Sequence, residues 1–167
     1  MKHVDYLESL QACKKAIDYA AGFATLQSSW DACARGDWML WLIGRTIDRT
    51  NETELRKITL AKARCAKLVI HLMKDERSRN AVEVAEQFGL GNATRQELDA
   101  AYAAAAAFAA AYAAYAAYAA SASANANANA DADAAAAAAY AAAENKILQQ
   151  CADIVRVSYP HAPEEIK

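Results

Sequence analysis

Apolar residues recur every three to four positions along most of the chain, the spacing of a helix that buries one face. In residues 4–19, Leu7, Leu10 and Ile17 share such a face, and Gly22 follows as a helix end. The pattern predicts one amphipathic helix over this first segment.

Two more helices are expected before residue 50. A short helix over residues 25–33 is followed by Gly36, which we expect to end it. A longer helix over residues 37–49 begins at Asp37, whose carboxylate is suited to an N-cap. This third helix carries most of the large aromatic side chains of the N-terminal half.

The same spacing continues to residue 88. Asn51 is the expected N-cap of a helix that runs to Met73, and Glu54 lies at the third position of that cap. A further helix is expected over residues 79–88, with Gly89 as its end.

From Ala100 to Ala143 the composition changes, because thirty-one of these forty-four positions are alanine. Alanine is the strongest helix former. Thr94 and Glu97 form a capping box, so we expect a helix over residues 95–120. The alternation of alanine with Ser, Asn and Asp over residues 121–133 is interpreted as a turn into a second helix that stops before Pro160. The expected result is a long antiparallel helical hairpin.

One face of the first hairpin helix is lined with aromatic residues, including Tyr112, Tyr115 and Tyr118. A stripe at this spacing indicates core packing beside closely approaching helices. A structural alanine-rich helical protein is a second alternative. Alanine faces and tyrosines on long helices would also suit a homodimer or higher homo-oligomer.

With 167 residues, five Gly, two Pro and a net charge of −2, the chain favours a single all-α domain and leaves little room for a loop-rich or β-rich fold. We expect a helical bundle of about six to seven helices. The expected parts are N-terminal helices in residues 1–92, an Ala/Tyr-rich hairpin in residues 93–159 and a tail in residues 160–167.

No segment resembles a signal peptide or a membrane span, so a cytoplasmic protein is expected. The four cysteines are far apart and form no C-x-x-C pair, which argues against a zinc site or a redox dithiol. We expect four buried free thiols, at Cys13, Cys33, Cys65 and Cys151.

The helix over residues 37–49 carries the clearest binding signal. Its core face holds Met39, Leu40, Ile43 and Ile47, and the opposite face holds two tryptophans and two arginines. Indole rings and guanidinium groups bind planar or anionic ligands by stacking and bidentate hydrogen bonds. The alternative is a central helix packed on all sides, with its arginines paired to aspartates. The members of the opposite face are Trp38, Trp41, Arg45 and Arg49.

The helix that follows Asn51 is basic on one side. Six Lys or Arg residues and no acidic residue lie between Arg56 and Lys74, and Arg64, Lys67 and His71 share the basic side. A charge run of this kind is either a solvated face or an electropositive wall for an anion or an acidic partner. Bulk nucleic-acid binding is not expected, because the whole chain is slightly acidic and has no nucleic-acid motif.

No catalytic motif is present. The three histidines are scattered, there is no G-x-S-x-G and no Gly-rich phosphate loop, and no acidic cluster has metal-ligand spacing. We therefore expect a protein that is not an enzyme and that uses no cofactor or metal ion.

One segment carries a family resemblance. The run Arg35-Gly36-Asp37-Trp38-Met39-Leu40-Trp41-Leu42 within residues 30–42, a cysteine-containing helix around Cys65, the Ala/Tyr/Asp-rich tract and residues 151–156 together resemble the immunity protein family of bacteria and phages. The resemblance implies a small helical protein that binds and neutralises something harmful. It draws attention to family-typical positions at Trp30, Arg35, Asp37, Trp38, Trp41, Asp153 and Arg156.

Two functional hypotheses follow. An antitoxin-like protein that blocks a toxin predicts an exposed, charge-patterned patch without a deep pocket. A phage or bacterial anti-defence protein that sequesters an anionic, nucleotide-type signal predicts a concave site lined by Trp38 or Trp41, with Arg45 and basic-helix residues. The candidate ligand-binding residues are Trp38, Trp41, Arg45, Arg49, Arg35, Asp37, Trp30, Arg64, Lys67, His71, Asp153 and Arg156.

Overall fold

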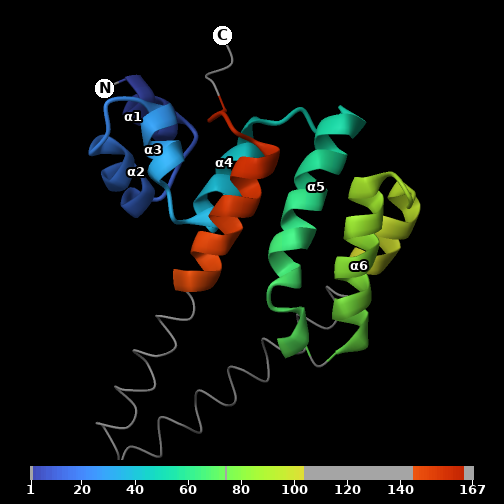
Figure 1. Ribbon diagram of the computed structural model, residues 1–167. Helices are drawn as coiled ribbons and strands as arrows, with labels where there is room; N and C mark the ends of the chain where they lie inside the picture. The colour runs from blue at the N-terminus through green and yellow to red at the C-terminus, as the bar shows by residue number, and fades with distance from the viewer. Residues whose placement is uncertain (1, 74, 104–144, 164–167) are drawn as a thin grey trace, which may run out of the picture.

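The computed structural model describes residues 2–73, 75–103 and 145–163, and every regular element in these ranges is a helix (Figure 1). The all-α prediction is confirmed. The turn expected in residues 121–133 and most of the expected hairpin lie outside the described residues. The elements are α1 (Lys2–Ser9), α2 (Lys14–Ala21), α3 (Leu26–Ala32), α4 (Gly36–Thr46), α5 (Glu52–Lys67), the 3-10 helix η1 (Ile70–Leu72), α6 (Glu76–Leu90) and helical residues 95–103 and 145–158.

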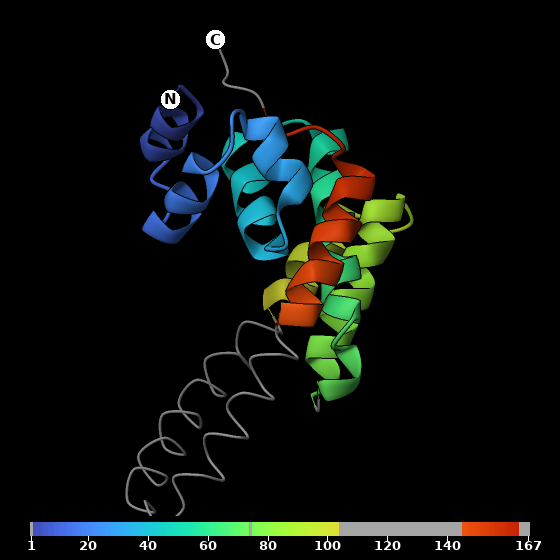
Figure 2. The ribbon, with the colours of Figure 1, turned by 60° about the vertical axis from the view of Figure 1, so that its left-hand side comes forward.

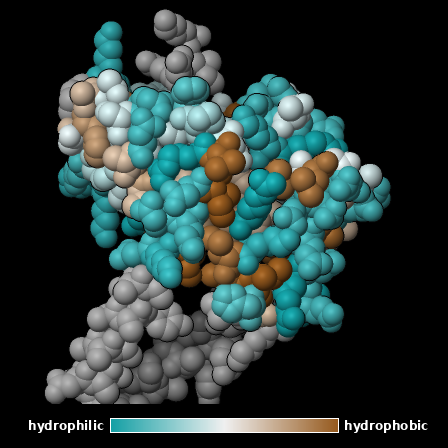
Figure 3. All heavy atoms as spheres, viewed as in Figure 1, coloured by the Kyte–Doolittle hydropathy of each residue, from teal (hydrophilic) through white to brown (hydrophobic). Residues whose placement is uncertain are grey.

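The helices form two neighbouring groups. In Figures 1 and 2, α1, α2 and α3 gather on one side of α4, and α5 pairs with α6 on the other side. Residues 145–158, which we call the C-terminal helical segment, run beside α4. Figure 3 shows a band of hydrophobic residues in the middle of this face, and Val157 of the segment is 80% exposed.

The main core joins α4 to α5 and to the C-terminal helical segment. Ile43, Ala152 and Val155 are fully buried in it. Gly36 lets the start of α4 touch the segment, because a Cβ at this position would lie 2.4 Å from Cys151 Cβ. Gly36 is thus the first residue of α4, where the sequence had suggested only a helix end. The packing of distant helices, and not local turn formation, requires this glycine.

A second core joins α5, α6 and helical residues 95–103 around the fully buried Phe88. The expected helix end at Gly89 is wrong. Gly89 lies inside α6 and packs on α5, where a Cβ would lie 2.5 Å from Leu60 Cβ. The helix ends instead at Gly91, which adopts a left-handed backbone with φ 88°. It also begins three residues earlier than expected, after the N-cap Asp75.

The single helix expected over residues 4–19 is two helices. Gln11 has a left-handed backbone with φ 63° and lies where the helix is interrupted between α1 and α2. Neither Gly nor Pro marks this break, so the sequence carried no local signal for it. The helix expected to reach Met73 is also shorter, since α5 ends at Lys67 and η1 follows.

Helix starts are correct where the sequence predicts caps at Asn51 and Thr94. The side chains of Thr25 and Asn51 accept backbone N–H groups at the starts of α3 and α5. Thr94 and Glu97 form the expected reciprocal capping box. The C-terminal helical segment ends before Pro160, as expected. In the part of the chain that the structure describes, no helix has the length and apolarity needed to cross a membrane.

Candidate functional site

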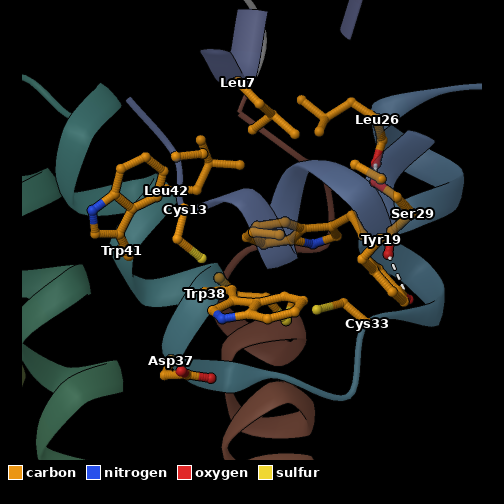
Figure 4. A pocket seen from close by; sticks show the side chains of 15 residues that line it. Leu7, Cys13, Tyr19, Leu26, Ser29, Cys33, Asp37, Trp38, Trp41 and Leu42 are labelled. Atoms are coloured by element: carbon orange, nitrogen blue, oxygen red, sulfur yellow. Dashed lines mark hydrogen bonds between the residues drawn. The ribbon is translucent and has the colours of Figure 1, made fainter. Parts of the chain in front are cut away.

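A pocket of about 360 Å³ lies where α1, α2 and α3 face α4 (Figure 4). Its volume is within the range of pockets that hold small ligands. Most of its lining is aliphatic or aromatic, and Asp37 is the one formally charged lining residue among those described. The lining residues are Leu7, Ala12, Cys13, Ala16, Tyr19, Ala20, Leu26, Ser29, Trp30, Cys33, Asp37, Trp38, Met39, Trp41 and Leu42.

Two tryptophans of α4 form one wall of this pocket. Trp38 and Trp41 are one helical turn apart, and Figure 4 shows Trp38 across the pocket from Leu7 and Leu26, with Trp41 at its flank beside Leu42. Tyr19 of α2 packs against Trp38, with ring centroids 5.8 Å apart. All three rings are half-buried. The two tryptophans therefore contact the core and also present surface to the pocket. The helix packing and the ligand-binding surface that the sequence offered as alternatives thus both involve these rings.

Trp30 belongs mainly to the core. It is 3% exposed, and its indole Nε1 donates a hydrogen bond to the carbonyl oxygen of Tyr159 at 3.1 Å. This bond ties α3 to the residues that follow the C-terminal helical segment. Because the indole N–H is already engaged, Trp30 contributes ring surface to the pocket.

Arg35 and Asp37 form a rigid pair at the start of α4. The Arg35 guanidinium donates to both carboxylate oxygens of Asp37, at 2.9 and 2.6 Å, and lies 4.5 Å from the centroid of the Trp38 ring. The hydrogen bond from Arg35 lowers the pKa of Asp37. Asp37 is therefore ionised at neutral pH. The sequence predicted Asp37 as the N-cap of this helix, but Arg35 occupies that position.

Arg45 and Arg49 lie near the other end of α4. The guanidinium of Arg45 is 5.7 Å from the centroid of the Trp41 ring. Arg49 donates to the carbonyl oxygen of Gly44 at 3.2 Å. Neither arginine lines the pocket, although Arg45 lies beside a residue that does.

Asp153 and Arg156 hold the fold together at the end of α3. Arg156 donates to the carbonyl oxygens of Cys33 at 2.7 Å and Trp30 at 3.2 Å, and its second amino group pairs with Asp153 at 2.7 Å. These bonds satisfy carbonyl groups at a helix C-terminus. The contacts account for both residues without a ligand, and neither lines the pocket.

The basic side of α5 does not join the pocket. Lys67 pairs with Glu86 of α6 at 2.5 Å, while Arg64 and His71 are exposed elsewhere. The Arg56 side chain is also engaged within the protein, because it pairs with Glu52 and donates to the carbonyl oxygen of Phe88. Lys67 and Arg56 thus serve contacts within the protein, and Arg64 and His71 lie at exposed positions away from the pocket.

The structure adds pocket residues that the sequence did not single out. Cys13 was expected to be buried but is exposed, because the break after α1 places it at the N-cap of α2 and on the pocket wall. Tyr19 and Cys33 also line the pocket, and burial raises the pKa of the Cys33 thiol. No local sequence signal identifies these residues, since they meet Trp38 only through the packing of α2 and α3 on α4.

The arrangement is suited to holding an apolar group. The side chains of Ser29 and Trp30 already donate to backbone carbonyls, at Leu26 and Tyr159 respectively. Within the described residues, no group of three or more His, Cys, Asp or Glu side chains could hold a metal ion.

Comparison of the chain with protein-family models, curated proteins and solved structures finds no match. The resemblance to immunity proteins therefore stays a prediction that depends on the sequence motif alone.

Proposed function

We propose that this chain is a non-catalytic binding protein that sequesters a small molecule by enclosing its apolar part between α4 and helices α1 to α3. The observation that carries the proposal is the pocket wall formed by Trp38 and Trp41, with aliphatic residues across the pocket from Trp38. Large aromatic surfaces facing a cavity gain free energy when a ligand displaces water, at about 25 cal/mol per Å² of apolar area.

The resemblance to immunity proteins gives a biological reason for binding a small molecule, namely to neutralise it. A protein that holds a harmful small molecule neutralises it by lowering its free concentration, and this needs no catalytic group. The motif that carries the resemblance, from Arg35 to Leu42, includes both tryptophans of the pocket wall. Five of the eight residues of this motif line the pocket: Asp37, Trp38, Met39, Trp41 and Leu42.

The pocket favours a small molecule over a toxin surface. A toxin-blocking protein was expected to have a charge-patterned patch without a deep pocket, whereas Trp38 and Trp41 line a concave site. The lining is poorer in hydrogen-bonding groups than recognition of a nucleobase requires, since Ser29 and Trp30 donate within the protein. We therefore favour a ligand with an apolar body over a nucleotide.

The test is a fluorescence titration with N-phenylnaphthylamine, a neutral aromatic dye that becomes bright in apolar surroundings. Ala16→Phe would fill the pocket, because Ala16 lies on its wall. Ala21→Phe is the matched control, since Ala21 is an exposed residue of the same helix outside the lining. The unmodified protein and Ala21→Phe are expected to bind the dye, and Ala16→Phe is expected to lose at least tenfold in affinity.

Dye binding that survives Ala16→Phe, or no binding by the unmodified protein, would contradict the proposal. Melting curves of both variants confirm that they fold. A thermal-shift screen then compares apolar compounds with adenosine monophosphate, because a ligand at a hundredfold excess over Kd adds about 2.7 kcal/mol of stability. A shift with the nucleotide alone would favour the nucleotide hypothesis, and capture of a specific toxin by a folded Ala16→Phe variant would favour the antitoxin hypothesis.

A further inference from the structure

We propose that the ligand of this pocket is an amphipathic anion, with its apolar body between the helices and its anionic group outside, on Arg45. This inference rests on the proposed function, since it specifies the chemistry of the molecule that the pocket holds. It depends on a difference between the two ends of α4: Arg35 is held in an ion pair by Asp37, and Arg45 forms no ion pair within the described residues.

The end of the pocket at the start of α4 carries a closed ion pair, Arg35–Asp37. Asp37 reaches the pocket wall, and the two hydrogen bonds from Arg35 keep its carboxylate ionised and in place. Figure 4 shows Asp37 below Trp38. Because the Arg35 guanidinium donates to both carboxylate oxygens of Asp37, this end offers an anionic group an arginine that is already paired. The anionic part of a ligand is therefore directed toward the other end.

The end of the pocket at Trp41 is positive. The guanidinium of Arg45 is 5.7 Å from the Trp41 ring, and no carboxylate in residues 2–73, 75–103 or 145–163 forms an ion pair with it. Arg45 is exposed, so its donors are accessible to a ligand. Arg35, by contrast, is already bound to Asp37.

A second cation, Arg49, strengthens this positive end. Arg49 donates to the carbonyl oxygen of Gly44, the residue before Arg45, so its guanidinium lies beside the same turn of α4. Like charges grouped without paired acids raise the local potential and attract an anion.

The chemistry of the two ends therefore selects the ligand class. A guanidinium binds carboxylate, sulfonate or phosphate oxygens through two parallel hydrogen bonds. Trp41 belongs to both parts of the site, because it lines the pocket and lies beside Arg45. A molecule that fills the pocket from this end places its polar head within reach of Arg45.

The test compares two dyes with the same aromatic body and different charge. Anilinonaphthalene sulfonate carries a sulfonate, and N-phenylnaphthylamine carries none. We expect the sulfonate dye to bind the unmodified protein roughly tenfold more tightly, the ratio that one accessible charge-assisted hydrogen bond gives. Raising the ionic strength should weaken binding of the sulfonate dye and leave the neutral dye unchanged.

Arg45→Gln is expected to abolish the difference between the dyes while the neutral dye binds as before. Arg79→Gln, an exposed arginine on α6 that removes the same charge, is the control and should preserve the difference. Equal affinities of the two dyes, or a difference that survives Arg45→Gln, would overturn this inference and leave the proposed function standing. Failure of both dyes to bind would instead contradict the proposed function.

Discussion

The two halves of this molecule pack in different ways. In the half formed by α5, α6 and residues 95–103, Ala63, Ala85 and Gly89 let the backbones approach around Phe88. In the half formed by α1 to α4, indole and phenol rings hold the helices apart around a pocket. Small residues at an interface allow helices to meet closely, whereas large rings at the edge of a core leave space between them.

The two halves also differ in how particular arginines and lysines are paired. In the α5 and α6 half, Lys67 is paired with Glu86 and Arg56 with Glu52. In the α1 to α4 half, Arg45 forms no ion pair within the described residues and lies beside a pocket wall. Lys67 thus joins α5 to α6 through its charge, whereas Arg45 is a cation beside a pocket wall and is available to a ligand.

The largest change in stability is expected for Phe88→Ala, which tests whether the two halves are independent. Phe88 is fully buried in the second core, so its removal is expected to lower the free energy of unfolding by about 3–5 kcal/mol. Chemical denaturation measures this loss. Phe23→Ala, at a half-buried ring beside Tyr19, should cost clearly less. Under conditions where the Phe88 variant remains folded, its affinity for N-phenylnaphthylamine should match that of the unmodified protein. A weaker affinity would show that the two halves are coupled.

A matched pair of glycine variants gives an intermediate effect. Gly36→Ala and Gly89→Ala each introduce a Cβ that would lie 2.4 and 2.5 Å, respectively, from a Cβ of a neighbouring helix. Each is expected to cost about 1–3 kcal/mol, because a packed interface must separate. Gly36→Ala moves the start of α4 and should also weaken dye binding, while Gly89→Ala should not. The same change in affinity for both variants would contradict the division into two halves.

The smallest expected effect concerns the ion pair of Asp37. Its pKa is lowered in the folded protein from the ordinary value of 3.8, so ionised Asp37 stabilises the fold above that pH. The contribution is lost as pH falls through the lower, folded-state pKa. Both partners are partly exposed, so the effect should stay below about 1 kcal/mol.

Melting curves measured from pH 7 down to about pH 2.5 test this prediction, because this pH range includes the ordinary pKa of an aspartate carboxyl group. The stability difference between the unmodified protein and Asp37→Asn should shrink as the pH falls. Asp5→Asn, at an exposed position on α1, is the control. A difference that is constant across this range would show that the ion pair does not contribute through ionisation.

Sequence reasoning was most successful where a helix signal is local. The caps at Asn51 and Thr94 act within three or four residues, so the sequence contains all the atoms involved. It failed at Gly36 and Gly89, because both glycines serve contacts with helices far away in the chain. It also failed at Gln11, whose left-handed backbone no residue type nearby announces.

The candidate site was predicted in part for the same reason. The spacing of Trp38, Trp41 and Arg45 on one helix face is a local property, and the structure places the three residues together. Tyr19 and Cys13 come from α2, and only packing against α4 makes them part of the pocket wall. Arg156 was assigned to the site by resemblance, and its hydrogen bonds place it at the end of α3.

The sequence by itself determined that this protein is helical, where several of its helices begin, and which face of α4 carries indoles and guanidiniums. These properties follow from helix periodicity and from hydrogen bonds within one turn. Tertiary structure alone decided that Gly36 and Gly89 serve packing between helices, which arginines bind carbonyls or carboxylates of the protein, and that the two tryptophans of α4 face a pocket. A pocket is the space left between helices that are distant in the chain, so its shape depends on how those helices pack against each other.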